Sequence, residues 1–282
     1  MFKNKNVKIK HISVKGIDGN KVPVLVLVPA KAQTVKSAAV MWIHGGGYYS
    51  GMKEMAYITY AFSVTERFGV TVFSPGYRLS VQKPFPAALH DCYSALLYIK
   101  NEADKYNVRD DQIFVGGESA GGGLTAAVCM LARDRGEVNI AYQMPLYPML
   151  DDYDTPSSSD NHAFPWNTRR NHAGWKLYLR NDRASRESPY ASPARQTDYS
   201  NLPPAYTFVG DGEPFYSETV AYVDNLKKAG VEASIDIYHT DFHAFDMLRP
   251  NLEISKEAKE KFLRHFEYAL GHYFAEQKKN PS

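Results

Sequence analysis

Short runs of apolar or β-branched residues recur along the chain, separated by stretches whose apolar residues have helical spacing. Runs without polar alternation are typical of strands that are buried on both faces of a sheet. Ahead of them, residues 7–28 alternate apolar and polar positions around the turn Asp18-Gly19-Asn20, which predicts a β-hairpin. The predicted buried strands cover residues 38–43, 70–74, 113–116, 140–146, 206–209 and 233–238.

The stretches between these runs predict helices. In residues 85–106, apolar Ala88, Cys92, Leu96 and Ile99 recur at the spacing of one helical face. The alternation of strands and helices predicts an α/β fold, with a mostly parallel central sheet and helices on both faces. The predicted helices cover residues 85–106, 121–133, 216–229 and 255–274.

One stretch departs from this pattern. Residues 151–200 are rich in Asp, Ser, Asn, Arg and Pro, yet contain Trp166, Trp175, Tyr178 and Tyr190. A structureless loop of this length is uncommon in a compact domain, so the stretch is either disordered or a small cap with helices of its own. The aromatic residues favour the cap, because disordered segments contain few of them. We expect residues 1–282 to form one domain with a cap-like insertion at about 151–200.

Composition and charge narrow the classes of function. The formal net charge is +2 over 282 residues and no long Lys/Arg run is present, so the sequence favours binding neither to nucleic acid nor to an anionic membrane. Cys92 and Cys129 lie apart in apolar helical stretches, which is typical of reduced core cysteines. No run in the sequence resembles a membrane span or the core of a signal peptide, and we expect a cytoplasmic protein.

The clearest chemical signal is Gly117-Glu118-Ser119-Ala120-Gly121, which fits the pattern G-x-S-x-G. A predicted strand runs into it, and an Ala- and Leu-rich predicted helix runs out. A sharp strand-to-helix turn of this kind exposes a serine Oγ for nucleophilic attack, and the helix N-terminus favours negative charge that develops there. The alternatives are a Gly-rich turn without chemistry or a phosphate-binding loop, but the glycines do not match G-x-x-x-x-G-K-[ST].

A second glycine motif, His44-Gly45-Gly46-Gly47, follows the predicted strand at residues 38–43. Glycines allow backbone N–H groups to approach a substrate closely, and two N–H groups aimed at one point form an oxyanion hole. Alone, the motif could equally be a flexible loop. Together with G-x-S-x-G, it is the pairing found in lipases and esterases.

These motifs, taken in order, resemble the hormone-sensitive-lipase-like family of α/β-hydrolases. The resemblance implies the α/β-hydrolase fold and the hydrolysis of short acyl esters without a metal or other cofactor. It runs from about His44 to Phe245 and also includes Tyr77-Arg78-Leu79, Phe85-Pro86-Ala87-Ala88, Tyr190-Ala191-Ser192-Pro193, Leu202-Pro203-Pro204-Ala205 and Phe242-His243-Ala244-Phe245.

Two departures from the family pattern bear on the site. The family often has an Asp before Tyr-Arg-Leu and Ala-Pro-Glu after it, where this chain has Gly76 and Ser80-Val81-Gln82. We therefore expect the oxyanion loop to be braced differently here. Relatives with an N-terminal cap also have more residues before His44, so the cap of this chain should come from residues 151–200 alone.

The general base should be a histidine that follows the last core strand. His243 has this position and lies in the family-like Phe-His-Ala-Phe, and imidazole suits the role because it titrates near neutral pH. His239, four residues earlier, is a competitor. A His-x-x-x-His pair also suggests zinc, but no Glu stands in the HExxH position and no helix is predicted there, so we expect no metal.

The acid of a triad should lie between the serine and the histidine, after the preceding strand. The segment Gly210-Asp211-Gly212-Glu213-Pro214-Phe215 offers two carboxylates. By the resemblance, the acid stands immediately before Pro and a large apolar residue, which is the position of Glu213. Asp211 stays as the rival, although an Asp between two glycines is common in turns for structural reasons.

The implied reaction is nucleophilic acyl transfer. Ser119 attacks an ester carbonyl, His243 takes the serine proton, and Glu213 orients the imidazole and stabilises its charged form. The expected partner is a small-molecule ester. The sequence leaves the oligomeric state open, and a homodimer is one of the options. By the resemblance, the oxyanion is held by the N–H groups of Gly46, Gly47 and Ala120.

Other functions stay open at this point. A peptidase or acylpeptide hydrolase would use the same triad on amides, and a ligand-binding receptor of this fold would lack part of the triad. Aromatic Tyr48, Tyr49 and Phe215 could form the wall of a small acyl pocket, or they could equally be ordinary core residues.

Overall fold

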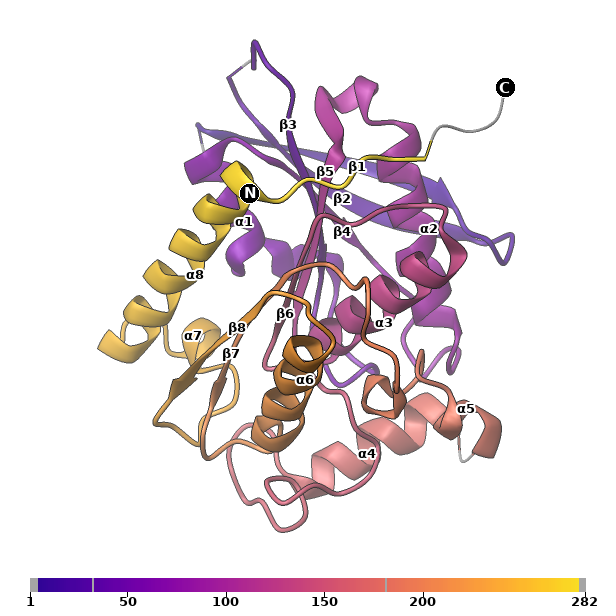
Figure 1. The fold of residues 1–282 in the computed structure, drawn as a ribbon, viewed down its shortest axis with the longest axis vertical. Coiled ribbons are helices and arrows are strands. Elements are labelled where there is room, and N and C mark those ends of the chain that lie inside the picture. Colours follow the sequence, from indigo (N-terminus) through magenta and orange to yellow (C-terminus); the bar gives the residue numbers. More distant parts are fainter. Residues whose placement is uncertain (1–4, 32, 181, 279–282) are drawn as a thin grey trace.

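The computed structural model describes residues 5–31, 33–180 and 182–278. Its centre is an 8-stranded sheet with the order β1-β2-β4-β3-β5-β6-β7-β8 (Figure 1). The first two strands form the predicted antiparallel hairpin, β2 also pairs antiparallel with β4, and strands β3 to β8 pair in parallel with one another. The strands are β1 (Val7–Lys15), β2 (Lys21–Pro29), β3 (Ser37–Ile43), β4 (Thr71–Pro75), β5 (Val108–Glu118), β6 (Tyr142–Leu146), β7 (Ala205–Gly210) and β8 (Ala233–Tyr238).

Helices cover both faces of this sheet. In Figure 1, α8 and α1 lie on one side of the strands and α2, α3 and α6 on the other. The longer helices are α1 (Tyr60–Phe68), α2 (Ala87–Asn101), α3 (Ala120–Arg135), α4 (Thr168–Leu179), α6 (Tyr216–Lys228) and α8 (Glu253–His272); α5 (Arg183–Glu187), α7 (Phe245–Leu248) and the 3-10 turns η1 (Lys53–Tyr57), η2 (Asp104–Tyr106) and η3 (Pro193–Arg195) are short.

Two buried clusters, one on each face, hold these layers together. Side chains alternate across a strand, so in β3 Met41 packs with α2 and α3, while Val40 and Trp42 pack with α1 and α8. Burial of such residues is the dominant favourable contribution to folding. Five of the six strands predicted to be buried on both faces are buried, but the prediction was wrong for β8, which lies at the edge of the sheet with most of its residues half-exposed and Ile237 49% exposed.

The sequence pattern did not predict α1 and placed the start of α2 two residues too early. Helix α1 buries Tyr60, Ala61 and Val64 and ends at Gly69, which has the left-handed conformation with φ of 69°. Helix α2 begins at Ala87, because Phe85 precedes Pro86 and a residue before proline is disfavoured in the helical conformation. The missed helix α1 packs on distant parts of the chain, whereas the start of α2 is fixed locally by Pro86.

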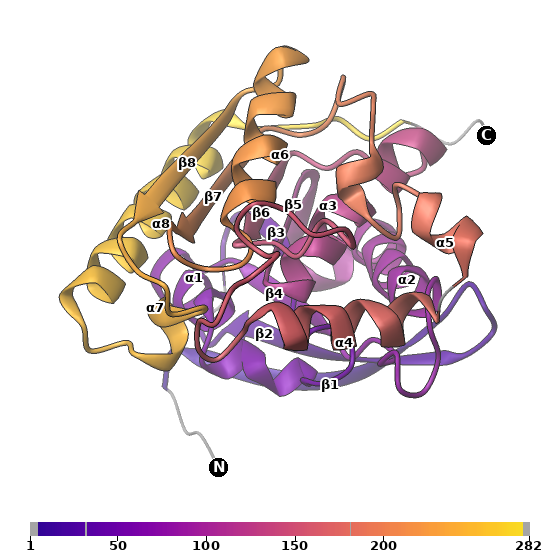
Figure 2. The ribbon, with the colours of Figure 1, turned by 90° about the horizontal axis from the view of Figure 1, so that it is seen from below.

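Residues 151–200 contain helices α4 and α5 and the turn η3, so they form structure of their own rather than a plain loop. Helix α4 begins after Asn167, whose side chain accepts a hydrogen bond from the N–H of Arg170. It buries Trp175 and Tyr178 against Tyr48. Seen from below in Figure 2, α4 crosses in front of the central strands, at the edge where they end.

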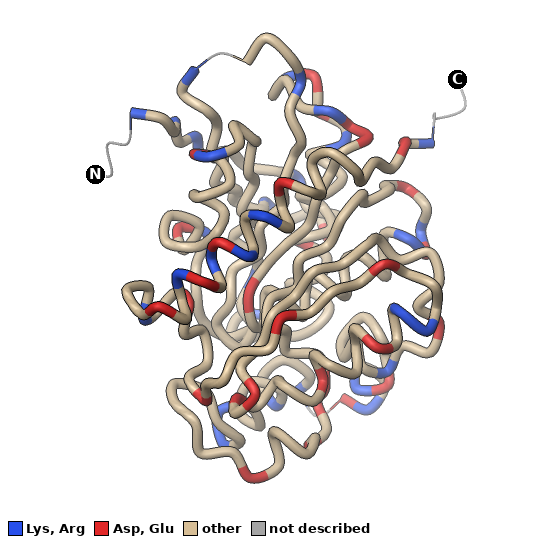
Figure 3. The backbone as a smooth tube through the Cα atoms, turned by 60° about the vertical axis from the view of Figure 1, so that its left-hand side comes forward, with Lys and Arg blue, Asp and Glu red and all other residues tan. Residues whose placement is uncertain are grey.

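Charges of both signs are interspersed on the part of the chain that the structure describes. Figure 3 shows basic and acidic residues alternating along α8, where Lys256 pairs with Glu253 and Lys261 with Glu257. Mixed charge of this kind is an ordinary solvent-exposed helix face. In residues 5–31, 33–180 and 182–278, no helix is both long enough and apolar enough to cross a bilayer.

Candidate active site

Ser119 lies in the sharp turn between β5 and α3. Its φ is 58°, a left-handed value that is strained for a residue with a side chain and is often found at functional sites. The turn is close-packed, because a Cβ at Gly121 would lie 2.0 Å from the carbonyl oxygen of Ile43. The glycines of the motif therefore allow β5, α3 and the end of β3 to meet beneath the serine.

The structure brings Ser119, His243 and Glu213 together. His243 Nε2 lies 2.9 Å from Ser119 Oγ, and His243 Nδ1 is hydrogen-bonded to the carboxylate of Glu213. Glu213 is fully buried and also accepts a bond of 3.0 Å from the N–H of Gly210. The three residues follow the ends of β5, β7 and β8, and parallel strands end at one edge of the sheet, where α/β proteins form their sites.

Asp211 and His239, the alternatives to Glu213 and His243 in the sequence, are also hydrogen-bonded to each other, but at the surface. His239 Nδ1 lies 2.9 Å from Asp211 Oδ2, and Asp211 Oδ1 accepts the N–H of Thr240. The His239 side chain is fully exposed, and its hydrogen bond with Asp211 raises the pKa of the imidazole. Because His239 and His243 face different partners, they do not converge on a metal, and no group of three or more potential ligands occurs among residues 5–31, 33–180 and 182–278.

The second glycine motif lies beside Ser119. Gly46 and Gly47 have φ of 118° and 59°, backbone conformations that favour glycine. A Cβ at Gly45 would lie 3.3 Å from Ser119 Cβ, so the loop after β3 contacts the turn that carries the serine. Ala120 is the first residue of α3, and an N–H at this position has no acceptor within its own helix.

Glu118 braces this loop, a role that sequence reasoning missed. Its carboxylate accepts the N–H of Gly45 at 3.1 Å and the indole N–H of Trp42 at 2.7 Å. Glu118 is almost fully buried, and burial raises the pKa of its carboxyl to about 8. The available signal was a carboxylate directly after the apolar run at residues 113–117, since buried carboxylates need partners.

Tyr77 braces the same loop from the other side. Its ring stacks on the His44 ring at a centroid distance of 4.2 Å, and its hydroxyl donates to the His44 carbonyl oxygen at 3.0 Å. Burial lowers the pKa of His44 to about 4, so this histidine is neutral at physiological pH. Glu118 and Tyr77 are thus the supports of the loop in a chain that has Gly76 where relatives often have Asp.

A second buried carboxylate lies behind the histidine. Tyr147 packs edge-on against His243, with ring centroids 5.2 Å apart, and its hydroxyl lies 3.4 Å from Asp246 Oδ2. Burial raises the pKa of Asp246 to about 6. Sequence reasoning did not single out either residue, because their contact joins the residue after β6 to helix α7, which is far away in the chain.

Aromatic residues from three segments surround the site. Phe215 is fully buried and packs edge-on on His243, and Tyr49 stacks on Trp166 of the insertion. Tyr48 instead stacks on Tyr178, and its hydroxyl donates to the Met149 carbonyl oxygen, so it is a core residue that joins the loop to α4. Tyr48 is therefore an ordinary core residue and not part of the wall of an acyl pocket.

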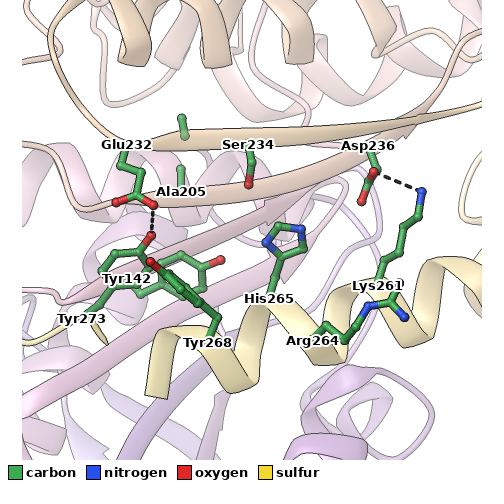
Figure 4. Close-up of a pocket in the computed structure, with 11 residues that line it drawn as sticks. Tyr142, Ala205, Glu232, Ser234, Asp236, Lys261, Arg264, His265, Tyr268 and Tyr273 are labelled. Carbon is green, nitrogen blue, oxygen red and sulfur yellow. Dashed lines mark hydrogen bonds and ion pairs between the residues drawn. The ribbon is translucent and has the colours of Figure 1, made fainter. Parts of the chain in front are cut away.

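A separate hollow of about 540 Å³ lies between the edge strand β8 and helix α8 (Figure 4). Asp236 and Lys261 form an ion pair at one end of it, and Glu232 accepts the hydroxyl of Tyr273 at the other. The described residues that line it belong to β6, β7, β8 and α8 or lie next to β8 and α8. Ser119, His243 and Glu213 are not among them.

Comparison with known proteins settles the family. The model of a family described as having the alpha/beta hydrolase fold matches residues 40–247. The chain belongs to this family. The match confirms the predicted fold class and, together with esterase relatives, the resemblance to the hormone-sensitive-lipase-like hydrolases.

The relatives of this hydrolase whose names state an activity include several esterases. An arylesterase of Saccharolobus solfataricus is 29% identical over 234 residues, which cover 81% of this chain and 74% of the relative. An ethyl acetate hydrolase of Pseudomonas putida is 27% identical, with 88% and 79% covered. The structure of a bacterial heroin esterase superposes with a TM-score of 0.89 at 32% identity, covering 94% of this chain and 85% of that one.

Some relatives are longer than this hydrolase. The chain spans 60% of the length of a related protein of Schizosaccharomyces pombe and 65% of one from Acanthamoeba polyphaga mimivirus.

Proposed function

We propose that the chain is a serine carboxylesterase that hydrolyses short-chain acyl esters through Ser119, His243 and Glu213. The observation that carries the proposal is the continuous hydrogen-bonded series from the Ser119 hydroxyl through the His243 ring to the buried Glu213 carboxylate. This arrangement suits acyl transfer, because the carboxylate holds the ring in the tautomer that leaves Nε2 free to accept the serine proton.

In the first half of the reaction, Ser119 Oγ attacks the ester carbonyl carbon while His243 Nε2 takes the hydroxyl proton. The carbonyl oxygen becomes an oxyanion, which the N–H groups of Gly46, Gly47 and Ala120 stabilise. Glu213 stabilises the imidazolium that forms. His243 then gives its proton to the ester oxygen, and the alcohol leaves an acyl group on Ser119.

In the second half, water takes the place of the alcohol. His243 removes a proton from the water as its oxygen attacks the acyl carbon, and the same N–H groups hold the second oxyanion. Return of the proton from His243 to Ser119 Oγ releases the carboxylic acid. An ester and water are thus the only reactants that the proposal requires.

The names of relatives support esters as the substrate class, with ethyl acetate named for one of them. Ser119 and His243 are only 6% and 5% exposed, which favours small substrates over a polypeptide. A receptor of this fold would lack part of the triad, whereas all three side chains are in contact here. The cytoplasmic location and a homodimeric state stay predictions.

The test is a series of p-nitrophenyl esters from acetate to dodecanoate, assayed beside an aminoacyl p-nitroanilide. We expect kcat/KM to be highest from acetate to butyrate and the anilide to be cleaved much more slowly. Ser119→Ala, which removes one oxygen, should lower ester turnover by several orders of magnitude and leave the fold unchanged by circular dichroism. Wild-type turnover in this variant would exclude the proposal.

A further inference from the structure

Trp166 is a residue of the insertion that lies against the candidate active site. Its indole packs on the oxyanion loop so closely that a Cβ at Gly47 would lie 2.2 Å from Cη2 of the ring. The ring centroid is 6.4 Å from those of both His243 and Phe215, and 6.1 Å from that of Tyr49. Trp166 therefore extends from the loop that follows β3 to the histidine and the segment after β7.

The loop that carries Trp166 is tied to the segment that carries Glu213. Asn161 Nδ2 donates to the Gly212 carbonyl oxygen at 3.0 Å, and Ser157 Oγ donates to the Pro214 carbonyl oxygen at 2.7 Å. The hydroxyl of Thr168 donates to the Ser158 carbonyl oxygen at 2.6 Å. With Trp166 only 8% exposed, these bonds hold the indole as a fixed wall rather than a mobile side chain.

The position of this wall relative to the reaction follows from the proton transfer. The leaving oxygen must accept its proton from His243 Nε2, so the alcohol portion of the ester begins beside the His243 ring. The acyl chain is bonded to the same carbonyl carbon but extends away from the histidine. A ring that contacts both the oxyanion loop and the His243 side of the site therefore borders the alcohol portion.

We propose that Trp166 limits the size of the alcohol portion that this enzyme accepts. The proposal rests on the proposed function, because it assigns one wall of the site at which Ser119 acts. Specificity of this kind is a matter of volume, and a difference of one methylene in an apolar pocket changes kcat/KM by about 10- to 200-fold. Replacement of an indole by a methyl group removes several times that volume.

The test uses Trp166→Ala and two substrate series. In the first, the acyl group is always acetyl and the alcohol increases from methanol to butanol and 2-phenylethanol, with acid release followed by titration. In the second, the alcohol is always p-nitrophenol and the acyl chain increases from acetyl to octanoyl. We expect the kcat/KM ratio of phenethyl to methyl acetate to rise about tenfold or more, and the octanoyl-to-acetyl ratio to stay unchanged.

Phe164→Ala is the matched control. Phe164 lies in the same loop, is 65% exposed and packs on Phe242 rather than on the site, so neither ratio should change. If Trp166→Ala fails to fold, Trp166→Phe keeps an aromatic ring of smaller volume and should give a smaller gain in the first series.

Three results would overturn the proposal: an equal gain in Phe164→Ala, a gain confined to the acyl series, or no gain in either series from a folded variant that still hydrolyses esters. Failure of the proposed function is a separate result, because wild-type protein would then show no ester turnover that depends on Ser119.

Discussion

Asp211 Oδ2 and His239 Nδ1 lie 2.9 Å apart at the surface, so the two residues that rival Glu213 and His243 in the sequence are paired with each other. Glu213→Gln should lower kcat by about 10² to 10⁴, because a neutral amide does not stabilise the imidazolium. Asp211→Asn should leave kcat within about threefold, since its hydrogen bonds are on the exposed loop. Both variants are assayed with p-nitrophenyl acetate, and an inactive Asp211→Asn beside an active Glu213→Gln would show that Asp211 is the acid.

Glu118→Gln should weaken the support of the oxyanion loop. Two N–H groups, of Gly45 and Trp42, point at the carboxylate, and a glutamine offers one oxygen and one NH₂ donor in its place. One N–H must then face another donor, so we expect kcat to fall about tenfold, less than the 10² to 10³ that loss of a whole oxyanion donor costs.

The loss in Glu118→Gln should be in kcat rather than KM, because the oxyanion forms only in the transition state. Tyr77→Phe is the comparison variant, since it removes one hydroxyl bond to His44 and keeps the stacked ring. A rise in KM at constant kcat would count against a positioning role of Glu118.

Glu118→Gln should also change how the free energy of unfolding depends on pH. Burial raises the pKa of Glu118 from 4.5 in an exposed chain to about 8, so between these values the folded state binds more protons than the unfolded state. The contribution of this group to the free energy of unfolding is thus full below about pH 4.5 and is lost as pH rises to 8.

Denaturant unfolding at several pH values measures this effect. The pKa values of buried Asp246 and Glu218 are also raised, so these groups also make the free energy of unfolding decrease as pH rises. The effect of Glu118 is therefore measured as the difference between wild type and Glu118→Gln. Glu118→Gln should show a smaller decrease of the free energy of unfolding from pH 6 to 8. Parallel curves for the two proteins would contradict the raised pKa.

Gly121→Ala should destabilise the protein and abolish most activity. Its Cβ would lie 2.0 Å from the Ile43 carbonyl oxygen, a backbone atom that cannot move without displacing β3, and overpacking of this kind costs about 1–3 kcal/mol. Gly271→Ala in α8 is the control, because nothing lies within 4 Å of its Cβ and alanine favours a helix by about 1 kcal/mol. Calorimetry should give a lower Tm for the first variant and an equal or higher Tm for the second.

Much of the fold could be predicted from the sequence, because its signals are local. Continuous apolar runs matched buried strands everywhere except at the edge strand β8, and the hairpin turn, the helix spacing and the two glycine motifs each depend on a few neighbouring residues. Helix α1 was missed because it is short and is stabilised by distant partners, with Tyr60 packing on Phe208 and Phe262. The register of the family motif favoured Glu213 over Asp211, and in the structure Glu213, after β7, is hydrogen-bonded to His243, after β8.

By itself, then, the sequence determined the order of the strands and of helices α2, α3, α6 and α8, the sharp turn at Ser119 and the chain order of Ser119, Glu213 and His243. These depend on backbone preferences and on the spacing of apolar residues, which act over a few residues. Only the tertiary structure decided that Glu118 supports the oxyanion loop, that Tyr147 and Asp246 lie behind His243, and that Trp166 lies over Gly47. Such contacts join segments far apart in the chain, and only the packing of the sheet, helices and insertion brings them together.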